Sequence, residues 1–149
     1  MAIPVEDRIA VEDLLTEFCW RVDHARAETV AELFIADGKI VTPMFTAHGR
    51  DQIAEHFRNR DRQGDILSRH QWMNLRLEPV SPTRLKAEMV VQTYLAKGAP
   101  PSSTPGLMVG DSLDVFEKGS DGVWRFAERQ LRVIFKTEIV PPAGGHSSP

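Results

Sequence analysis

Two residues of this chain, Asp23 and His70, are of types that could act together as a base. Asp23 lies near the end of an amphipathic N-terminal segment, and His70 opens a segment with the composition of a strand. If the carboxylate accepts the proton on Nδ1 of the imidazole, the other ring nitrogen is left free to take a proton from a bound molecule. The carboxylate would also stabilise the imidazolium that forms, as in a Ser-His-Asp triad. The pair predicts general-base chemistry if the fold brings the two side chains together.

Three helices are predicted in the first part of the chain, and the first of them must carry Asp23. Apolar residues at helical spacing place Asp23 at the boundary of an apolar stripe, where a carboxylate can point into a cavity or into solvent. The second helix ends at the turn signal Asp37-Gly38. Residues 39–45 then predict a short strand interrupted by Pro43. The predicted helices span residues 5–25, 28–34 and 50–62.

Strands are predicted for the rest of the chain, and the first of them must carry His70. Four long β-type segments are separated by stretches rich in Pro, Gly and Ser, as turns require. They cover residues 68–80, 83–97, 106–118 and 122–135. This order predicts an α+β fold, a curved sheet wrapped over helices on one face, with a cone-shaped pocket between the two layers. We expect one domain over residues 1–140 and a flexible tail over residues 141–149.

The composition favours a cytoplasmic, soluble protein of a single domain. A chain of 149 residues can bury a substantial core as one domain. The net charge of −3 argues against nucleic acid as a partner. A single cysteine, Cys19, excludes an intrachain disulfide framework and suits a reducing compartment. We expect no membrane partner and no secretion, because no apolar run approaches the roughly 20 residues of a membrane span and no signal peptide is apparent.

Five motifs follow one another along most of the chain, from about Val5 to Phe135. They are RVDHAR, ELFIADG, HGRDQIAEHF, RHQWMN and DGVWRFAERQLRV. Their order and spacing resemble the nuclear-transport-factor-2-like superfamily in its SnoaL-like, polyketide-cyclase-like branch. The resemblance implies that superfamily's α+β barrel, with a curved mixed or antiparallel sheet over three N-terminal helices. It also implies a homodimer or homotrimer.

Within the superfamily the chain resembles scytalone dehydratase and hexachlorocyclohexane dehydrochlorinase. Both use an Asp–His dyad, and Asp23 and His70 match its two members. Asn74 follows His70 as in the pattern H-x-x-x-N, and Arg129 resembles a position near the pocket mouth. The chain departs from these enzymes at Phe18 and Val22, which leaves the identity of the substrate open.

Six further side chains are predicted to contact a bound molecule. Three polar ones could orient a substrate oxygen or a leaving group, and three aromatic ones could form an apolar wall. For each of them a purely structural role remains the alternative, because most large apolar residues are core residues and most strand arginines face solvent. The polar residues are Asn74, Tyr94 and Arg129, and the aromatic residues are Trp20, Phe45 and Trp72.

No metal and no cofactor are predicted. The other histidines are scattered without metal-ligand spacing, and no glycine-rich phosphate motif occurs. We interpret the charged run at residues 58–63 as a solvated helix face, His24 as solvent-exposed and Cys19 as a packed thiol.

These features predict a cofactor-independent lyase that uses the Asp–His pair to remove a proton from a small, largely apolar cyclic substrate. An isomerase or a cyclase of the same fold would use the same base with a different outcome. Two hypotheses for a non-catalytic protein stay open. One is an assembly subunit related to the small subunit of ring-hydroxylating dioxygenases, and the other is a protein that binds a ligand without chemistry.

Overall fold

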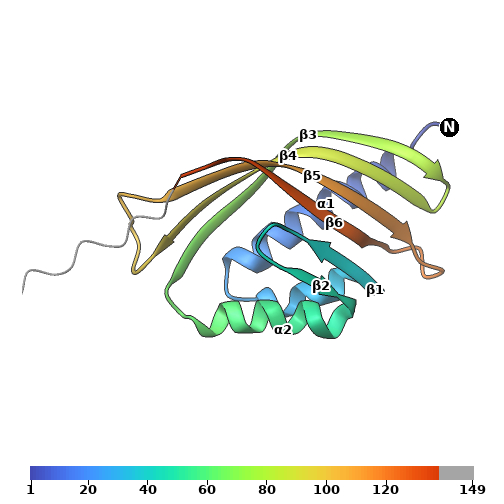
Figure 1. Cartoon of the computed structure of the whole chain (residues 1–149). Helices are drawn as coiled ribbons and strands as arrows, with labels where there is room; N and C mark the ends of the chain where they lie inside the picture. Colours follow the sequence, from blue (N-terminus) through green and yellow to red (C-terminus); the bar gives the residue numbers. More distant parts are fainter. Residues whose placement is uncertain (138–149) are drawn as a thin grey trace, which may run out of the picture.

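A curved sheet covers the helices in the computed structural model, which describes residues 1–137 (Figure 1). The helical elements are α1 (Val5–Asp23), the 3₁₀ helix η1 (Ala27–Leu33) and α2 (Gly49–Arg62). The strands are β1 (Phe34–Val41), β2 (Thr46–His48), β3 (Ile66–Ser81), β4 (Arg84–Lys97), β5 (Gly106–Lys118) and β6 (Trp124–Lys136). The predicted tail at residues 141–149 lies outside the described residues.

The sheet is mixed and remains open. Its six strands are ordered β2-β1-β6-β5-β4-β3, with β1 parallel to β6 and the other neighbours antiparallel. The predicted α+β class and the sheet wrapped over three helices are therefore confirmed. The four long strands were each predicted to within a few residues, because alternating apolar residues and turn-forming linkers mark them clearly.

The segment between η1 and β2 differs from the prediction. The turn expected at Asp37-Gly38 is wrong, because β1 runs through both residues. The ring of Phe34 is fully buried, and a Cβ at Gly38 would lie only 2.9 Å from that ring. Gly38 is thus needed for close packing along an irregular strand rather than for a turn. The predicted strand over residues 39–45 ends at Val41.

An aromatic cluster joins α1 to the sheet. Phe34 and Phe126 are fully buried with ring centroids 5.1 Å apart, and Phe18 of α1 meets Phe126 edge-on at 5.7 Å. Edge-to-face packing of this kind adds to the stabilisation from burial itself. The cluster fixes the inner face of α1, and with it Asp23 at the end of the helix, against the sheet.

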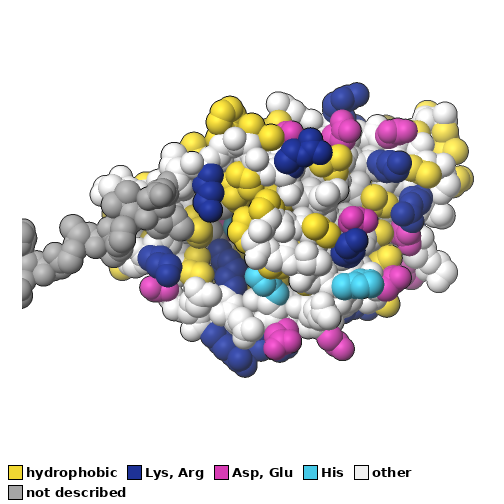
Figure 2. Space-filling view, in the orientation of Figure 1, with side chains coloured by type: hydrophobic (Ala, Val, Ile, Leu, Met, Phe, Trp, Pro, Cys, Tyr) yellow, Lys and Arg dark blue, Asp and Glu magenta, His cyan; other side chains and the backbone are white. Residues whose placement is uncertain are grey.

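Basic and acidic side chains are intermixed over the face seen in Figure 2. Within residues 1–137, no helix is both long enough and apolar enough to cross a membrane.

Candidate active site

A cavity of about 250 Å³ lies between the inner face of the sheet and the helices α1 and α2. Its wall is mainly apolar and includes Val22, Phe57 and Val91, with a few polar groups among them. The volume is below the roughly 300–1,000 Å³ of pockets for drug-sized ligands, so the cavity suits a molecule of one or two rings.

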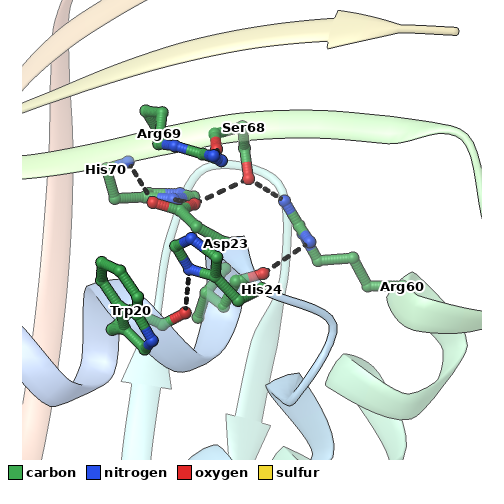
Figure 3. Close-up of polar contacts among 8 residues, drawn as sticks. Trp20, Asp23, His24, Arg60, Ser68, Arg69 and His70 are labelled. Atoms are coloured by element: carbon green, nitrogen blue, oxygen red, sulfur yellow. Dashed lines mark hydrogen bonds and ion pairs between the residues drawn. The ribbon is translucent and has the colours of Figure 1, made fainter. Parts of the chain in front are cut away.

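Asp23 and His70 are in direct contact at this cavity (Figure 3). The Nδ1 atom of His70 lies 2.6 Å from Oδ1 of Asp23, and the backbone N–H of His70 donates to Oδ2 at 2.7 Å. The Asp23 side chain is only 4% exposed, whereas His70 is 27% exposed and lines the cavity. The carboxylate thus lies behind the imidazole, fixes its orientation and leaves its other nitrogen available to a ligand.

Two neighbouring elements hold the Asp23 carboxylate. Ser68 lies two residues before His70 on β3, so both side chains point to the same face of the strand, and the Ser68 hydroxyl donates to Oδ1 of Asp23 at 2.7 Å. Arg60 of α2 donates to the Ser68 oxygen at 2.7 Å and to the carbonyl of Val22 at 3.0 Å. Oδ1 of Asp23 thus contacts both the Ser68 hydroxyl and the His70 imidazole, Oδ2 accepts from the His70 backbone, and the Arg60 guanidinium reaches the carboxylate through Ser68.

The interpretation of residues 58–63 as a solvated helix face is wrong for Arg60. Its guanidinium is half-buried, and burial lowers its pKa despite the nearby Asp23. Ile53, Phe57 and Arg60 follow the spacing i, i+4, i+7 and lie on one face of α2. That spacing was readable from the sequence and would have placed Arg60 beside the two buried residues.

The pKa of Asp23 is lowered from its ordinary value. Burial by itself would raise this pKa, but the hydrogen bonds from His70 and Ser68 and the charge interaction with the imidazole outweigh burial. Asp23 therefore stays ionised throughout the neutral range, as an acceptor for the Nδ1 proton must.

The lowered pKa makes a prediction about acid stability. An aspartate with a depressed folded-state pKa contributes stability above the unfolded-state value of about 3.9, and this contribution is lost as the pH falls through the folded-state pKa. Asp23→Asn should lower the free energy of unfolding at pH 7 by about 1–3 kcal/mol and reduce its decline below pH ~4. Urea unfolding at a series of pH values measures both effects. The exposed residue Asp13 supplies a control, because Asp13→Asn should keep the wild-type curve; an unchanged curve for Asp23→Asn would contradict the prediction.

A second polar pair lies on the cavity wall. The Arg129 guanidinium approaches Oδ2 of Asp114 to 2.9 Å through Nη2, and the Ser112 hydroxyl donates to Oδ1 of Asp114 at 2.7 Å. Arg129 is also stacked on the rings of Phe18 and Phe126, with Cζ 4.3 and 4.6 Å from the ring centroids. Burial raises the pKa of Asp114, while Arg129 and Ser112 act in the opposite direction. The contact with Arg129 and the hydrogen bond from Ser112 together compensate the burial of the Asp114 carboxylate.

The other predicted site residues divide into two groups. Phe45 and Trp72 line the cavity with Arg129; Phe45 stacks on His56 at 3.5 Å between ring centroids, and the Trp72 indole N–H donates to the Thr16 hydroxyl at 3.2 Å.

The second group lies away from the cavity. Tyr94 is 40% exposed and adjoins Thr93, whose side chain lines the cavity, so Tyr94 points to the outer face of the sheet. Trp20 is 55% exposed and stacks on His24 at 3.9 Å between ring centroids. Asn74 is exposed and has a left-handed backbone with φ 55°, where the register of β3 shifts.

Besides Arg60, the polar residues at the site that were not predicted include His56, Ser68, Ser112 and Asp114. Burial and the nearby Arg60 lower the pKa of His56, which lines the cavity as a neutral imidazole. Ser112 and Asp114 lie four and two residues before the buried Phe116 on β5, so all three side chains point to the same face of the strand. This spacing was the sequence signal that could have placed them at the site. Cys19 also lines the cavity, and burial raises its pKa to about 11. Among residues 1–137, no three His, Cys, Asp or Glu side chains are grouped as metal ligands.

The chain belongs to the SnoaL-like domain family, which matches residues 4–130. No curated protein sequence matches it. The fold is similar to that of a candidate scytalone dehydratase from Novosphingobium aromaticivorans DSM 12444, with a TM-score of 0.77, 24% identity and coverage of 94% of this chain and 95% of that chain.

Two further solved structures share the fold. Hexachlorocyclohexane dehydrochlorinase LinA-type3 from Novosphingobium barchaimii LL02 has a TM-score of 0.74 and 23% identity, covering 97% of this chain and 96% of that chain. ActVI-ORFA from Streptomyces coelicolor has a TM-score of 0.72 and 19% identity, covering 85% of this chain and 96% of that chain. The family match and these similarities in fold together confirm the predicted SnoaL-like branch of the nuclear-transport-factor-2-like superfamily.

Proposed function

We propose that the protein is a cofactor-independent lyase that eliminates a small leaving group from a largely apolar, one- or two-ring substrate. The observation that carries the proposal is the 2.6 Å contact between Asp23 and His70, with the imidazole on the wall of an otherwise mainly apolar cavity. The names of two structural relatives, a candidate scytalone dehydratase and a dehydrochlorinase, support elimination as the reaction class.

In the proposed reaction the free nitrogen of His70 takes a proton from a substrate carbon. The electrons of that C–H bond form a C=C bond, and the leaving group departs from the neighbouring carbon with its bonding electrons. Asp23 stabilises the imidazolium while it exists. When the leaving group is hydroxide, the imidazolium can return the proton, so that water is released and the neutral base is restored.

A simple substrate tests this reaction. The bicyclic β-hydroxyketone 3-hydroxy-1-tetralone has an acidic C–H next to its carbonyl and a hydroxyl on the following carbon. Loss of water and tautomerisation convert it into 1-naphthol, which is followed by its fluorescence. We expect the wild-type protein to accelerate naphthol formation. Deuterium exchange in D₂O without naphthol formation would instead favour an isomerase or a cyclase. If neither naphthol formation nor exchange were observed, a ligand-binding or assembly role would be favoured.

The contribution of Asp23 can be measured in the same assay. Asp23→Asn should lower kcat by about 10²-fold or more, because the amide neither fixes the imidazole tautomer nor stabilises the imidazolium. Binding of the product 1-naphthol should change little, because Asp23 lies behind His70. The matched control is again Asp13→Asn, for which wild-type turnover is expected. Wild-type turnover by Asp23→Asn would remove the carboxylate from the mechanism.

A further inference from the structure

The cavity has a second polar centre besides His70, formed by Arg129 with Asp114 behind it. We propose that Asp114 determines specificity: it cancels the charge of Arg129, so the cavity binds a neutral oxygen acceptor such as a carbonyl and discriminates against carboxylates. The proposal concerns the cavity of the proposed function but rests on binding rather than on turnover.

The geometry of Asp114 supports a dedicated electrostatic role. Its side chain is completely buried, and its two oxygens face Arg129 at 2.9 Å and the Ser112 hydroxyl at 2.7 Å. A buried carboxylate is costly unless it is paired, and here the pairing cation is itself on the cavity wall. The negative charge therefore lies directly behind the group that a ligand would contact.

Arg129 keeps donors for a ligand after this pairing. A guanidinium carries five N–H donors in a planar fork, and the approach to Asp114 is made through one nitrogen, Nη2. The rings of Phe18 and Phe126 hold the guanidinium plane in place. Arg129 can thus donate to a ligand oxygen from a fixed position, while its net charge toward the cavity is balanced.

The other basic side chains that line the cavity are paired with a carboxylate or have a lowered pKa. His70 contacts Asp23 directly through Nδ1. Arg60 has Asp23 within its charge environment, with Ser68 bridging the two side chains. His56 is held neutral by burial and by Arg60. A carboxylate entering the cavity would lose its hydration and would meet the negative charge of Asp114 behind Arg129. A carboxamide or ketone of the same shape carries no charge and would not meet this repulsion.

A matched pair of probes tests this selectivity. 1-Naphthamide and 1-naphthoate have nearly the same shape and differ mainly in charge at pH 7. Isothermal titration calorimetry on the wild-type protein should give at least ~10-fold tighter binding for the amide, the scale expected when a buried charge lacks a partner. Equal or tighter binding of naphthoate, or failure of naphthamide to bind, would overturn the proposal. This measurement needs no variant and therefore does not depend on whether one folds.

The variant Asp114→Asn should shift the preference toward the anion. Because Arg129 would then carry an uncancelled charge, naphthoate affinity should rise by about 10-fold or more, with a smaller change for naphthamide. The control is Asp121→Asn, which removes the same charge from an aspartate paired with Arg125 on an exposed turn, and both affinities should stay at the wild-type value. A correctly folded Asp114→Asn protein with the wild-type ratio would refute the role of Asp114. Selective binding without turnover of 3-hydroxy-1-tetralone would retain this inference and defeat only the proposed function.

Discussion

His70→Gln is expected to lower the rate of naphthol formation from 3-hydroxy-1-tetralone by about 10²–10⁴-fold, the range typical of a positioned general base. Glutamine preserves much of the side-chain size but cannot take up a proton at neutral pH. The backbone N–H of residue 70 would still donate to Asp23, so the local strand geometry should be retained. The loss should appear in kcat, with a smaller effect on KM, because the base acts in the transition state more than in substrate binding.

The control for this prediction is His24→Gln. His24 follows Asp23 in the sequence but stacks on Trp20, and its Nδ1 contacts the Trp20 carbonyl at 2.9 Å outside the cavity. Turnover by His24→Gln should equal that of the wild type. If His70→Gln also retained near wild-type turnover, with circular dichroism showing a folded protein, proton abstraction by His70 would be excluded.

Strand alternation predicted part of the site and failed at one residue. Period-two alternation places His70, Trp72 and Asn74 on one face, and the first two do line the cavity. The register of β3 shifts at Asn74, which adopts φ 55° and is exposed. A bulge re-aims the side chains that follow it, and its position depends on pairing with β4, which local sequence does not specify.

The contact between Asp23 and His70 was predicted on a different basis. Helical periodicity placed Asp23 only at the boundary of an apolar stripe, and the pairing came from the family resemblance. The partners of the carboxylate were missed because they come from elements far apart in the sequence: Arg60 from α2 and Ser68 from β3.

Asp114 was missed for a related reason. An aspartate in a strand is usually solvent-exposed, and only the meeting of β5 with Arg129 on β6 compensates its burial. Spacing along β5 could thus have placed Asp114 on the buried face, whereas the partner that compensates its burial could not be identified from the sequence.

Arg129→Met is expected to lower the free energy of unfolding by about 3–5 kcal/mol, because it leaves the Asp114 carboxylate buried without its cation. Part of the loss can be recovered by protonation of Asp114, whose pKa burial already raises. The deficit should therefore be smaller at pH 5 than at pH 8. Urea unfolding monitored by circular dichroism at the two pH values measures it.

A second substitution separates the cost of the unpaired charge from the cost of altered packing. In the double variant Arg129→Met with Asp114→Leu the buried charge is absent, and buried ion pairs can often be replaced by apolar residues with little net loss. We expect most of the lost stability to return. Arg125→Met, which breaks the exposed pair with Asp121, should cost no more than about 1 kcal/mol. If the double variant were as unstable as Arg129→Met, the unpaired charge would not be the cause of the lost stability. The main structural contribution of Arg129 would then be its stacking on Phe18 and Phe126.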